Sequence, residues 1–216
     1  MKQIKIVSFD VEGTLVSHEF SEVLWHEAIP AKYAQKYGIS FEQARKTTTE
    51  EFEKIGFQGM EWYDAGYWCR RFQLGDPEPI IQSCVDKISF YPEVSEVLSS
   101  LAPHFKLTVA SSVPLYLLKY LLKDVEHYFT RVFSATSQYK QLKTAYFYSQ
   151  VCKAMDVEPA RIVHVGDSWK TDYINPGEVG INAFFLDRAR GKSVDSLADL
   201  RQLVTIMLDG YVSENG

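Results

Sequence analysis

The sequence lacks the features by which secreted, membrane and nucleic-acid-binding proteins are usually noticed. It has three cysteines, at positions 69, 84 and 152, without Cys-x-x-Cys spacing, which argues against a disulfide framework or a zinc site and for a reduced cytoplasm. No apolar run is longer than a strand, so we expect no membrane span. The formal net charge of −5 argues against a nucleic-acid partner, because phosphate backbones require clustered lysine and arginine.

What the chain does have is a regular alternation of strand and helix patterns. Short β-branched runs predict strands, and segments with apolar residues three and four apart predict the helices between them. Such alternation indicates a parallel sheet with helices on both faces, which is a doubly wound, Rossmann-like α/β fold. The predicted strands are 4–9, 106–110, 131–135, 161–165 and 182–186, and the predicted helices are 94–101, 115–122, 145–155 and 195–208, the last capped by Ser193 or Asp195.

One segment interrupts the alternation directly after the first strand. It contains no strand pattern, so the chain is predicted to leave the sheet, build a helical insert and return at Phe90. We expect an α/β core domain of residues 1–16 and 90–216 and a helical cap domain of residues 17–89, lying over the carboxyl edge of the sheet as a lid. The helices predicted in the cap are 22–36, 41–54 and 62–72.

Polar side chains follow four of the predicted strands. Taken alone, each has a structural explanation, because an Asp or Ser at a strand end is most often a cap or a turn residue. Taken together, their order along the chain is harder to explain in that way, since the carboxyl ends of parallel strands share one edge of a sheet. The residues are Asp10 and Glu12, Ser111 and Ser112, Lys140 and Lys143, and Asp167 and Asp172.

This set of side chains suits phosphoryl chemistry. Several carboxylates at one point repel each other unless a cation lies among them, and Mg²⁺ prefers such hard oxygen ligands. A carboxylate held ionised in this way can attack phosphorus and form an aspartyl-phosphate. A hydroxyl and an ammonium group would bind the remaining phosphoryl oxygens. His164, in contrast, lies inside a predicted strand and is expected to be a buried core residue.

The same residues resemble the four motifs of the haloacid dehalogenase superfamily. Residues 10–14, Asp-Val-Glu-Gly-Thr, are similar to its first motif, Asp-x-Asp-x-Thr. Residues 110–112 resemble the second motif, Lys143 the third, and residues 166–168 with Asp172 the fourth. The helical insert between the first and second motifs is typical of the phosphoglycolate-phosphatase-like branch. The resemblance implies a doubly wound parallel sheet with a helical cap.

The resemblance also implies a role for each matched residue. Asp10 would be the nucleophile, and Glu12 would act as general acid and base while its backbone carbonyl binds Mg²⁺. The phosphoryl group would be bound by Thr14, Ser111, Ser112 and Lys143, and the metal would be held by Asp10, Glu12, Asp167 and Asp172, the last from the second shell or through water.

Two positions depart from the family pattern. Glu12 stands where the commonest phosphatases of the superfamily have Asp, but Glu keeps an acid, whereas dehalogenases carry Tyr there. Thr144 follows Lys143 where the family often has Pro, and Lys140 is an alternative for the phosphate-binding lysine.

The sequence thus predicts a cytoplasmic, Mg²⁺-dependent phosphatase that acts on a small phosphorylated metabolite through an aspartyl-phosphate. Two alternatives use the same residues: a phosphoryl-transfer mutase of the superfamily, and a weakly active member kept for phosphate binding or regulation. A receiver domain also places an Asp and a Lys on a parallel sheet, but it would be shorter and would lack the helical insert.

Overall fold

The computed structural model describes residues 3–189 and 196–215. The chain divides into two compact units, one of residues 1–16 and 90–216 and one of residues 17–89, which we call the α/β unit and the helical unit. None of the helices described is long and apolar enough to cross a membrane.

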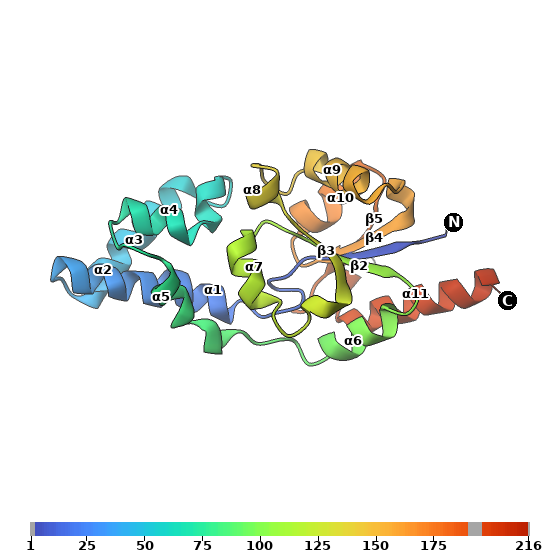
Figure 1. Ribbon diagram of the computed structural model, residues 1–216, viewed down its shortest axis with the longest axis horizontal. Helices are drawn as coiled ribbons and strands as arrows, with labels where there is room; N and C mark the ends of the chain where they lie inside the picture. Colours follow the sequence, from blue (N-terminus) through green and yellow to red (C-terminus); the bar gives the residue numbers. More distant parts are fainter. Residues whose placement is uncertain (1–2, 190–195, 216) are drawn as a thin grey trace. The chain divides into compact units, whose positions relative to one another are not determined.

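The α/β unit is built on a six-stranded parallel sheet with the strand order β3-β2-β1-β4-β5-β6. Helices α9 and α10 lie on one face of the sheet and α6 and α11 on the other, which confirms the predicted doubly wound α/β fold (Figure 1). The strands are β1 Ile6–Phe9, β2 Lys106–Ser111, β3 Phe129–Ser134, β4 Ile162–Gly166, β5 Asn182–Leu186 and β6 Ser196–Leu197. The helices are α6 Val94–Leu101, α7 Leu115–Leu121, α8 Ala135–Gln138, α9 Ala145–Met155, α10 Asn175–Glu178 and α11 Leu200–Asn215, with short turns η4 Glu126–Tyr128, η5 Pro159–Arg161 and η6 Trp169–Ile174.

The five predicted strands are confirmed, with boundaries that move by a few residues. The third begins at Phe129, two residues before the predicted start, and Ala135 already belongs to α8. The predicted helix 195–208 is wrong at its start, because Ser196–Leu197 pairs with the end of β5 and the helix begins only at Leu200. A two-residue strand is too short to show a period of two. The predicted caps Ser193 and Asp195 lie outside the described residues.

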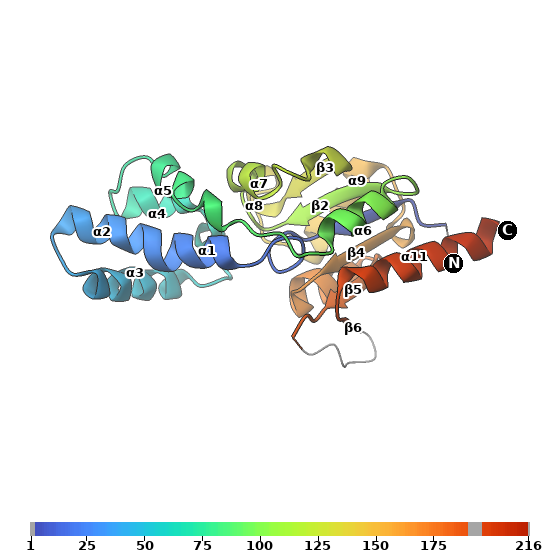
Figure 2. The ribbon, with the colours of Figure 1, turned by 90° about the horizontal axis from the view of Figure 1, so that it is seen from below.

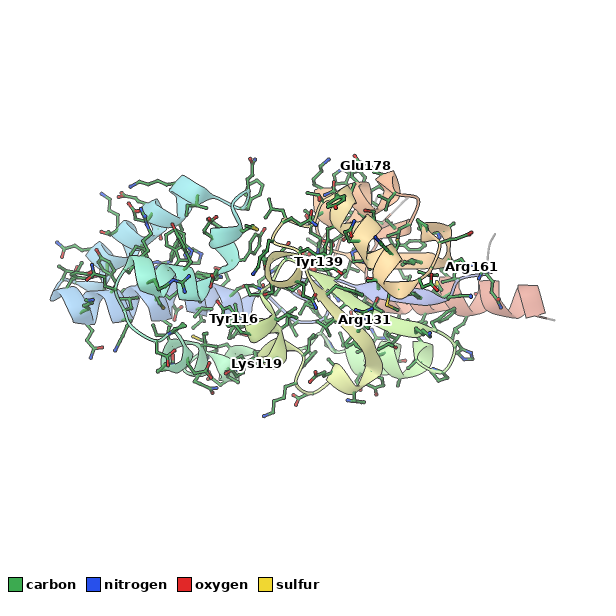
Figure 3. The ribbon with its side chains drawn as sticks, turned by 45° about the horizontal axis from the view of Figure 1, so that its top comes forward. Tyr116, Lys119, Arg131, Tyr139, Arg161 and Glu178 are labelled. Atoms are coloured by element: carbon green, nitrogen blue, oxygen red, sulfur yellow. The ribbon has the colours of Figure 1, made fainter. Side chains whose placement is uncertain are left out.

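The central strands are buried on both faces, as parallel sheets require. Every residue of β1 is buried, and β1 pairs with β2 and β4 so that Ser8 lies opposite Thr108 on one side and His164 on the other. At the edge of the sheet, the Arg131 side chain of β3 donates to the carbonyl of Ala154 in α9 at 2.6 Å (Figure 3).

The helical unit contains no strand among its residues, in agreement with the sequence pattern. Its first three segments, α1 Glu19–Val23, η1 Leu24–Ala28 and α2 Ile29–Tyr37, follow one another without a break, and α2 packs beside α3 Phe41–Ile55 (Figure 2). The remaining segments are η2 Met60–Tyr63, α4 Ala65–Arg71, α5 Glu78–Gln82 and η3 Val85–Lys87.

Local signals explain where these helices begin and end. Gly38 ends α2 with φ 65°, which is the left-handed conformation that glycine adopts without strain. Ser40 and Gln43 form a reciprocal capping box at the start of α3.

Candidate active site

Asp10 follows directly on β1 at the carboxyl edge of the sheet. Its backbone N–H donates to the Val165 carbonyl at 2.9 Å, so the position is held against β4. The residues after it form a tight loop in which the N–H groups of Leu15 and Val16 both donate hydrogen bonds to the Val11 carbonyl. Gly13 lies in this loop with φ 74°, which explains the glycine of the first motif. The loop holds the half-buried Glu12 two residues beyond Asp10.

Lys143 reaches this edge from the start of α9. Its buried ammonium lies 2.7 Å from Asp10 Oδ1 and 2.5 Å from Asp172 Oδ1, and it bridges the two carboxylates. Thr144, where the family often has Pro, is the N-cap of α9, and its hydroxyl accepts from the Phe147 N–H at 3.4 Å. Thr144 therefore replaces the family's Pro at the start of the helix and caps α9 with its hydroxyl, and Lys143 keeps its place before the helix. Lys140, the alternative considered from sequence, is exposed.

Asp172 lies in η6 and is completely buried. Its Oδ1 lies within 2.9 Å of His164 Nε2 as well as close to Lys143, and its Oδ2 accepts from the Ser168 N–H at 3.1 Å. The carboxylate packs so closely on β4 that a Cβ at Gly166 would come within 2.4 Å of Asp172 Cγ. Glycine is therefore required at the end of β4 for this acid to enter the site.

The three acids could hold a metal ion. One carboxylate oxygen from each of Asp10, Asp167 and Asp172 lies within 4.8 Å of the other two. These are hard oxygen donors of the type that Mg²⁺ prefers, so the residues present fit this ion. Both oxygens of Asp172 already accept hydrogen bonds, so this acid is poorly placed for direct contact with an ion.

The electrostatics of the acids support the same conclusion. Burial, together with the charges of Asp172 and Asp167, raises the pKa of Asp10 to about 7 against the opposing effect of Lys143. A cation beside Asp10 would offset these effects and favour its ionised form. Burial alone would raise the pKa of Asp172, but the Lys143 ammonium and the His164 hydrogen bond outweigh it and hold that pKa below its usual range. Conversely, Asp10 and Asp172 raise the pKa of Lys143 above its ordinary value although burial would lower it.

Three residues were predicted to bind the phosphoryl group besides Lys143: Ser111, Ser112 and Thr14. Ser111 ends β2, is buried, and accepts from the Val113 N–H at 3.2 Å. Ser112 is half-buried, and its carbonyl accepts from the Thr136 hydroxyl at 2.7 Å. Thr14 is completely buried, and its hydroxyl has no hydrogen-bond partner among the described residues.

Three residues that contact this site were not assigned to it from sequence. His164 is buried, as predicted, yet it hydrogen-bonds to Asp172, and Tyr148 of α9 lies 2.9 Å from the same His164 nitrogen. Arg188 follows β5 and donates to the carbonyls of Gly13 and Thr14 at 3.1 and 2.7 Å. In the sequence, His164 could have been noticed as a polar residue inside a predicted strand. Arg188 could have been noticed because it lies just after the predicted strand 182–186, at the same edge of the sheet.

Arg188 joins the loop after Asp10 to the segment by which the chain returns from the helical unit. It pairs with the buried Glu93 at 2.6 Å, and its guanidinium lies 3.5 Å from the centre of the Tyr91 ring. The loop that carries Glu12 is therefore fixed at its far end by a planar, charged group.

A family model for haloacid dehalogenase-like hydrolases matches residues 4–174, a span that contains Asp10, Lys143 and Asp172. The chain belongs to this family of hydrolases. No curated protein matches this hydrolase in sequence.

Solved structures share the fold of this chain. This hydrolase is similar to a phosphatase of the family from Thermococcus onnurineus, with 24% identity, a TM-score of 0.83, and 94% of this chain and 98% of that chain covered. A predicted phosphoglycolate phosphatase from Haemophilus somnus matches with 18% identity and a TM-score of 0.68 over 95% and 99% of the two chains. The L-2-haloacid dehalogenase RSc1362 matches with 20% identity and a TM-score of 0.62 over 96% and 100%. Phosphatases and dehalogenases thus share this fold, and the site must decide between them.

Proposed function

We propose that this hydrolase is a Mg²⁺-dependent phosphatase that cleaves a small phosphorylated metabolite through an aspartyl-phosphate on Asp10. The observation that carries the proposal is the buried Lys143 ammonium bridging Asp10 and Asp172, beside a third acid, Asp167, at metal-binding distance. With a divalent cation bound, such a site would place two positive groups, the ion and the Lys143 ammonium, beside a carboxylate nucleophile, and both could stabilise negative charge on a phosphoryl group.

Asp10 and Asp167 would hold the ion, together with the backbone carbonyl of Glu12. When bound, Mg²⁺ would neutralise charge on the phosphoryl oxygens and favour the ionised form of Asp10. Asp172 would act one shell further out by holding Lys143.

The chemical steps then follow from the side chains. An Asp10 oxygen bonds to phosphorus, the bond from phosphorus to the leaving oxygen breaks, and Glu12 gives that oxygen its proton. Glu12 next takes a proton from water as the water oxygen attacks phosphorus. The bond between phosphorus and Asp10 breaks, which releases orthophosphate and restores the Asp10 carboxylate, while Glu12 is again protonated. Lys143 and Ser111 would bind phosphoryl oxygens during both steps.

The acid at position 12 favours this function over dehalogenation. Hydrolysis of an ester of an alcohol needs a proton for the leaving oxygen, and a carboxyl group supplies it. A halide leaves without a proton, so dehalogenation would not need Glu12 as a general acid. In this proposal residues 17–89 keep the role of the helical cap domain that the sequence predicts.

The test is hydrolysis of p-nitrophenyl phosphate in the presence of Mg²⁺. We expect EDTA to abolish turnover, Mg²⁺ to restore it and Ca²⁺ to inhibit it, because Ca²⁺ takes more ligands at longer distances. Chloride release from 2-chloropropionate, measured in parallel, should stay at background. Full activity in EDTA, or chloride release without phosphatase activity, would refute the proposal.

A further inference from the structure

A row of polar side chains crosses the face of the sheet on which α9 packs. Thr108, Ser8 and His164 lie side by side in the register of β2, β1 and β4, and all three are buried. Their surroundings are an apolar cluster that includes Ile6, Ala110, Ile162 and Phe147. Polar groups in such surroundings are expected to have hydrogen-bond partners, and those of His164 lead toward the candidate active site.

The hydrogen bonds of His164 assign the position of its proton. Its Nδ1 lies 3.0 Å from Ser8 Oγ, and its Nε2 lies 2.9 Å from both Asp172 Oδ1 and the Tyr148 hydroxyl. Tyr148 has one proton and two possible acceptors besides the ring nitrogen: the Thr171 carbonyl at 2.8 Å and Asp172 Oδ1 at 3.3 Å. The carbonyl is the nearer of the two and can only accept, so it takes the proton. With Tyr148 donating to Thr171, Nε2 carries the ring proton and donates to Asp172, and Nδ1 accepts from Ser8.

This assignment completes the hydrogen bonding of Asp172. Oδ1 accepts from His164 and from Lys143, and Oδ2 accepts from the Ser168 N–H at 3.1 Å and from the Thr171 hydroxyl at 3.4 Å. Four donors around a carboxylate that is 0% exposed leave it one orientation. The position of the Lys143 ammonium, which lies between Asp172 and Asp10, depends on that orientation.

We propose that His164 is a positioning residue for the Asp172–Lys143 pair. Ser8 fixes the imidazole with its proton on Nε2, this N–H fixes Asp172, and Asp172 anchors Lys143 while the ammonium turns from Asp10 toward a phosphoryl oxygen. Without the anchor, Lys143 would stay closer to Asp10 and bind phosphate less well. The part of this inference that concerns turnover rests on the proposed function, whereas the part that concerns the ring proton does not.

The first experiment measures the tautomer in the whole protein. Long-range ¹H–¹⁵N correlation spectra of the labelled imidazoles should show His164 neutral with its proton on Nε2, and Ser8→Ala should lower the population of that tautomer. The signal that disappears in the spectrum of His164→Leu is the one that belongs to His164. A wild-type protein with the proton on Nδ1 would overturn the proposal. No substrate is needed, so a protein that hydrolyses no phosphate ester would sink the proposed function and leave this test standing.

The second experiment measures orthophosphate and Mg²⁺ binding by calorimetry, together with kcat and KM. His164→Leu should weaken orthophosphate binding and lower kcat/KM by about 10–100-fold, the usual effect of removing a residue that orients a functional side chain through a hydrogen bond. Mg²⁺ affinity should fall less than orthophosphate affinity, because both Asp10 and Asp167 are still present. His164→Gln keeps an N–H near the place of Nε2 and should recover most of the loss.

Thr108→Val is the matched control. Thr108 lies in the same polar row, is equally buried, and its hydroxyl has no hydrogen-bond partner among the described residues. The variant should therefore bind orthophosphate as the wild type does. Equal losses in His164→Leu and His164→Gln, or a loss in Thr108→Val as large as in His164→Leu, would show that the row is only structural. If His164→Leu does not fold, Ser8→Ala in the tautomer measurement decides.

Discussion

The two units differ in what they bury. In the described part of the helical unit, Thr48 is the one buried polar residue, and aromatic rings cluster on Phe52. The centroid of the Phe52 ring lies 4.7 Å from that of Trp68, 5.9 Å from that of Trp25 and 6.0 Å from that of Phe72. The α/β unit buries two carboxylates, an ammonium and an imidazole, which hydrogen bonds join in a chain from Asp10 through Lys143 and Asp172 to His164. An aromatic core stabilises through buried area alone, whereas a buried polar network stabilises only when every partner is present. Substitutions in the helical core should therefore change stability, and substitutions in the polar network should change chemistry as well.

The largest effect is expected from Asp10→Asn. Removing the nucleophile should lower steady-state hydrolysis of p-nitrophenyl phosphate by more than about a thousandfold. The raised pKa of Asp10, about 7, means that the folded state holds this proton more tightly than the unfolded chain does, so ionisation as the pH rises costs stability. Metal-free Asp10→Asn at pH 8 should thus unfold at a temperature no lower than the wild type in a calorimetric scan. Residual turnover above a thousandth would refute the covalent role.

The next effect concerns Glu12→Gln, compared on two kinds of substrate. p-Nitrophenolate leaves without a proton and an alkoxide does not, so an alkyl phosphate should lose about 10²–10⁴-fold in kcat/KM and p-nitrophenyl phosphate less. The phosphoenzyme should accumulate as a burst, because its hydrolysis loses the base, and Glu12→Asp should be mild. Equal losses on both substrates without a burst would assign the proton transfer to another group.

Lys143→Met should affect both activity and stability. Losing a charged donor to the phosphoryl group is expected to lower kcat by about 10²–10³-fold. It also leaves two buried carboxylates without their ammonium, which should cost about 3–5 kcal/mol of unfolding free energy. Added Mg²⁺ should stabilise this variant more than the wild type in thermal scans, because it replaces the missing positive charge. Lys140→Met, at an exposed position, is the control, and the same stability loss there would contradict the prediction.

A smaller effect is expected from Arg188→Lys, because an ammonium cannot replace three contacts made by one planar group. The unfolding free energy should fall by about 1.5–3 kcal/mol through the lost charged hydrogen bonds. kcat/KM should fall by about 10–100-fold as the loop of Glu12 shifts. Arg131→Lys is a matched control, since Arg131 also bonds to a carbonyl and lies 4.9 Å from an aromatic ring, that of Phe133 (Figure 3). Equal kinetic losses in both variants would contradict a role for Arg188 in the site.

The smallest effect should come from the helical core. The Trp68 indole N–H is buried without a hydrogen-bond partner among the described residues. In Trp68→Phe, relief of that unpaired donor, about 1–3 kcal/mol, should offset much of the lost packing. Urea unfolding should therefore show a small change in midpoint, and kcat should not change. A large loss of kcat would contradict the expectation that substitutions in the helical core change stability and not chemistry.

The sequence predicted most of the sheet because strand patterns are local. Buried β-branched runs identify β1, β2 and β4 without knowledge of their neighbours, and parallel strands bring their carboxyl ends to one edge. That geometry is enough to expect Asp10 close to Lys143, although 133 positions separate them along the chain. The start of α11 was missed because Ser196–Leu197 becomes a strand only by pairing with β5.

The rest of the site could not be predicted because it depends on register and side-chain direction. His164 meets Ser8 only because β1 and β4 pair in that register, and it meets Tyr148 only because α9 presents that side chain to the sheet. Arg188 brings together Gly13, Thr14 and Glu93, whose closeness no local pattern shows. Sequence spacing shows which residues share an edge, and packing decides which of them touch.

The chain enters and leaves the helical unit at adjacent points. Val16 and Phe90 form an antiparallel bridge, and the Ser17 N–H donates to the Ser89 carbonyl at 2.8 Å. Residues 17–89 therefore begin and end at neighbouring points of the α/β unit, as the loop of a hairpin does, and this does not depend on how many residues lie between. The entropy of closing a loop grows only slowly with the number of residues in it. Insertions, deletions or a wholly different bundle could be exchanged at this junction during evolution, and the strand register that holds Asp10 against Lys143 would not have to change.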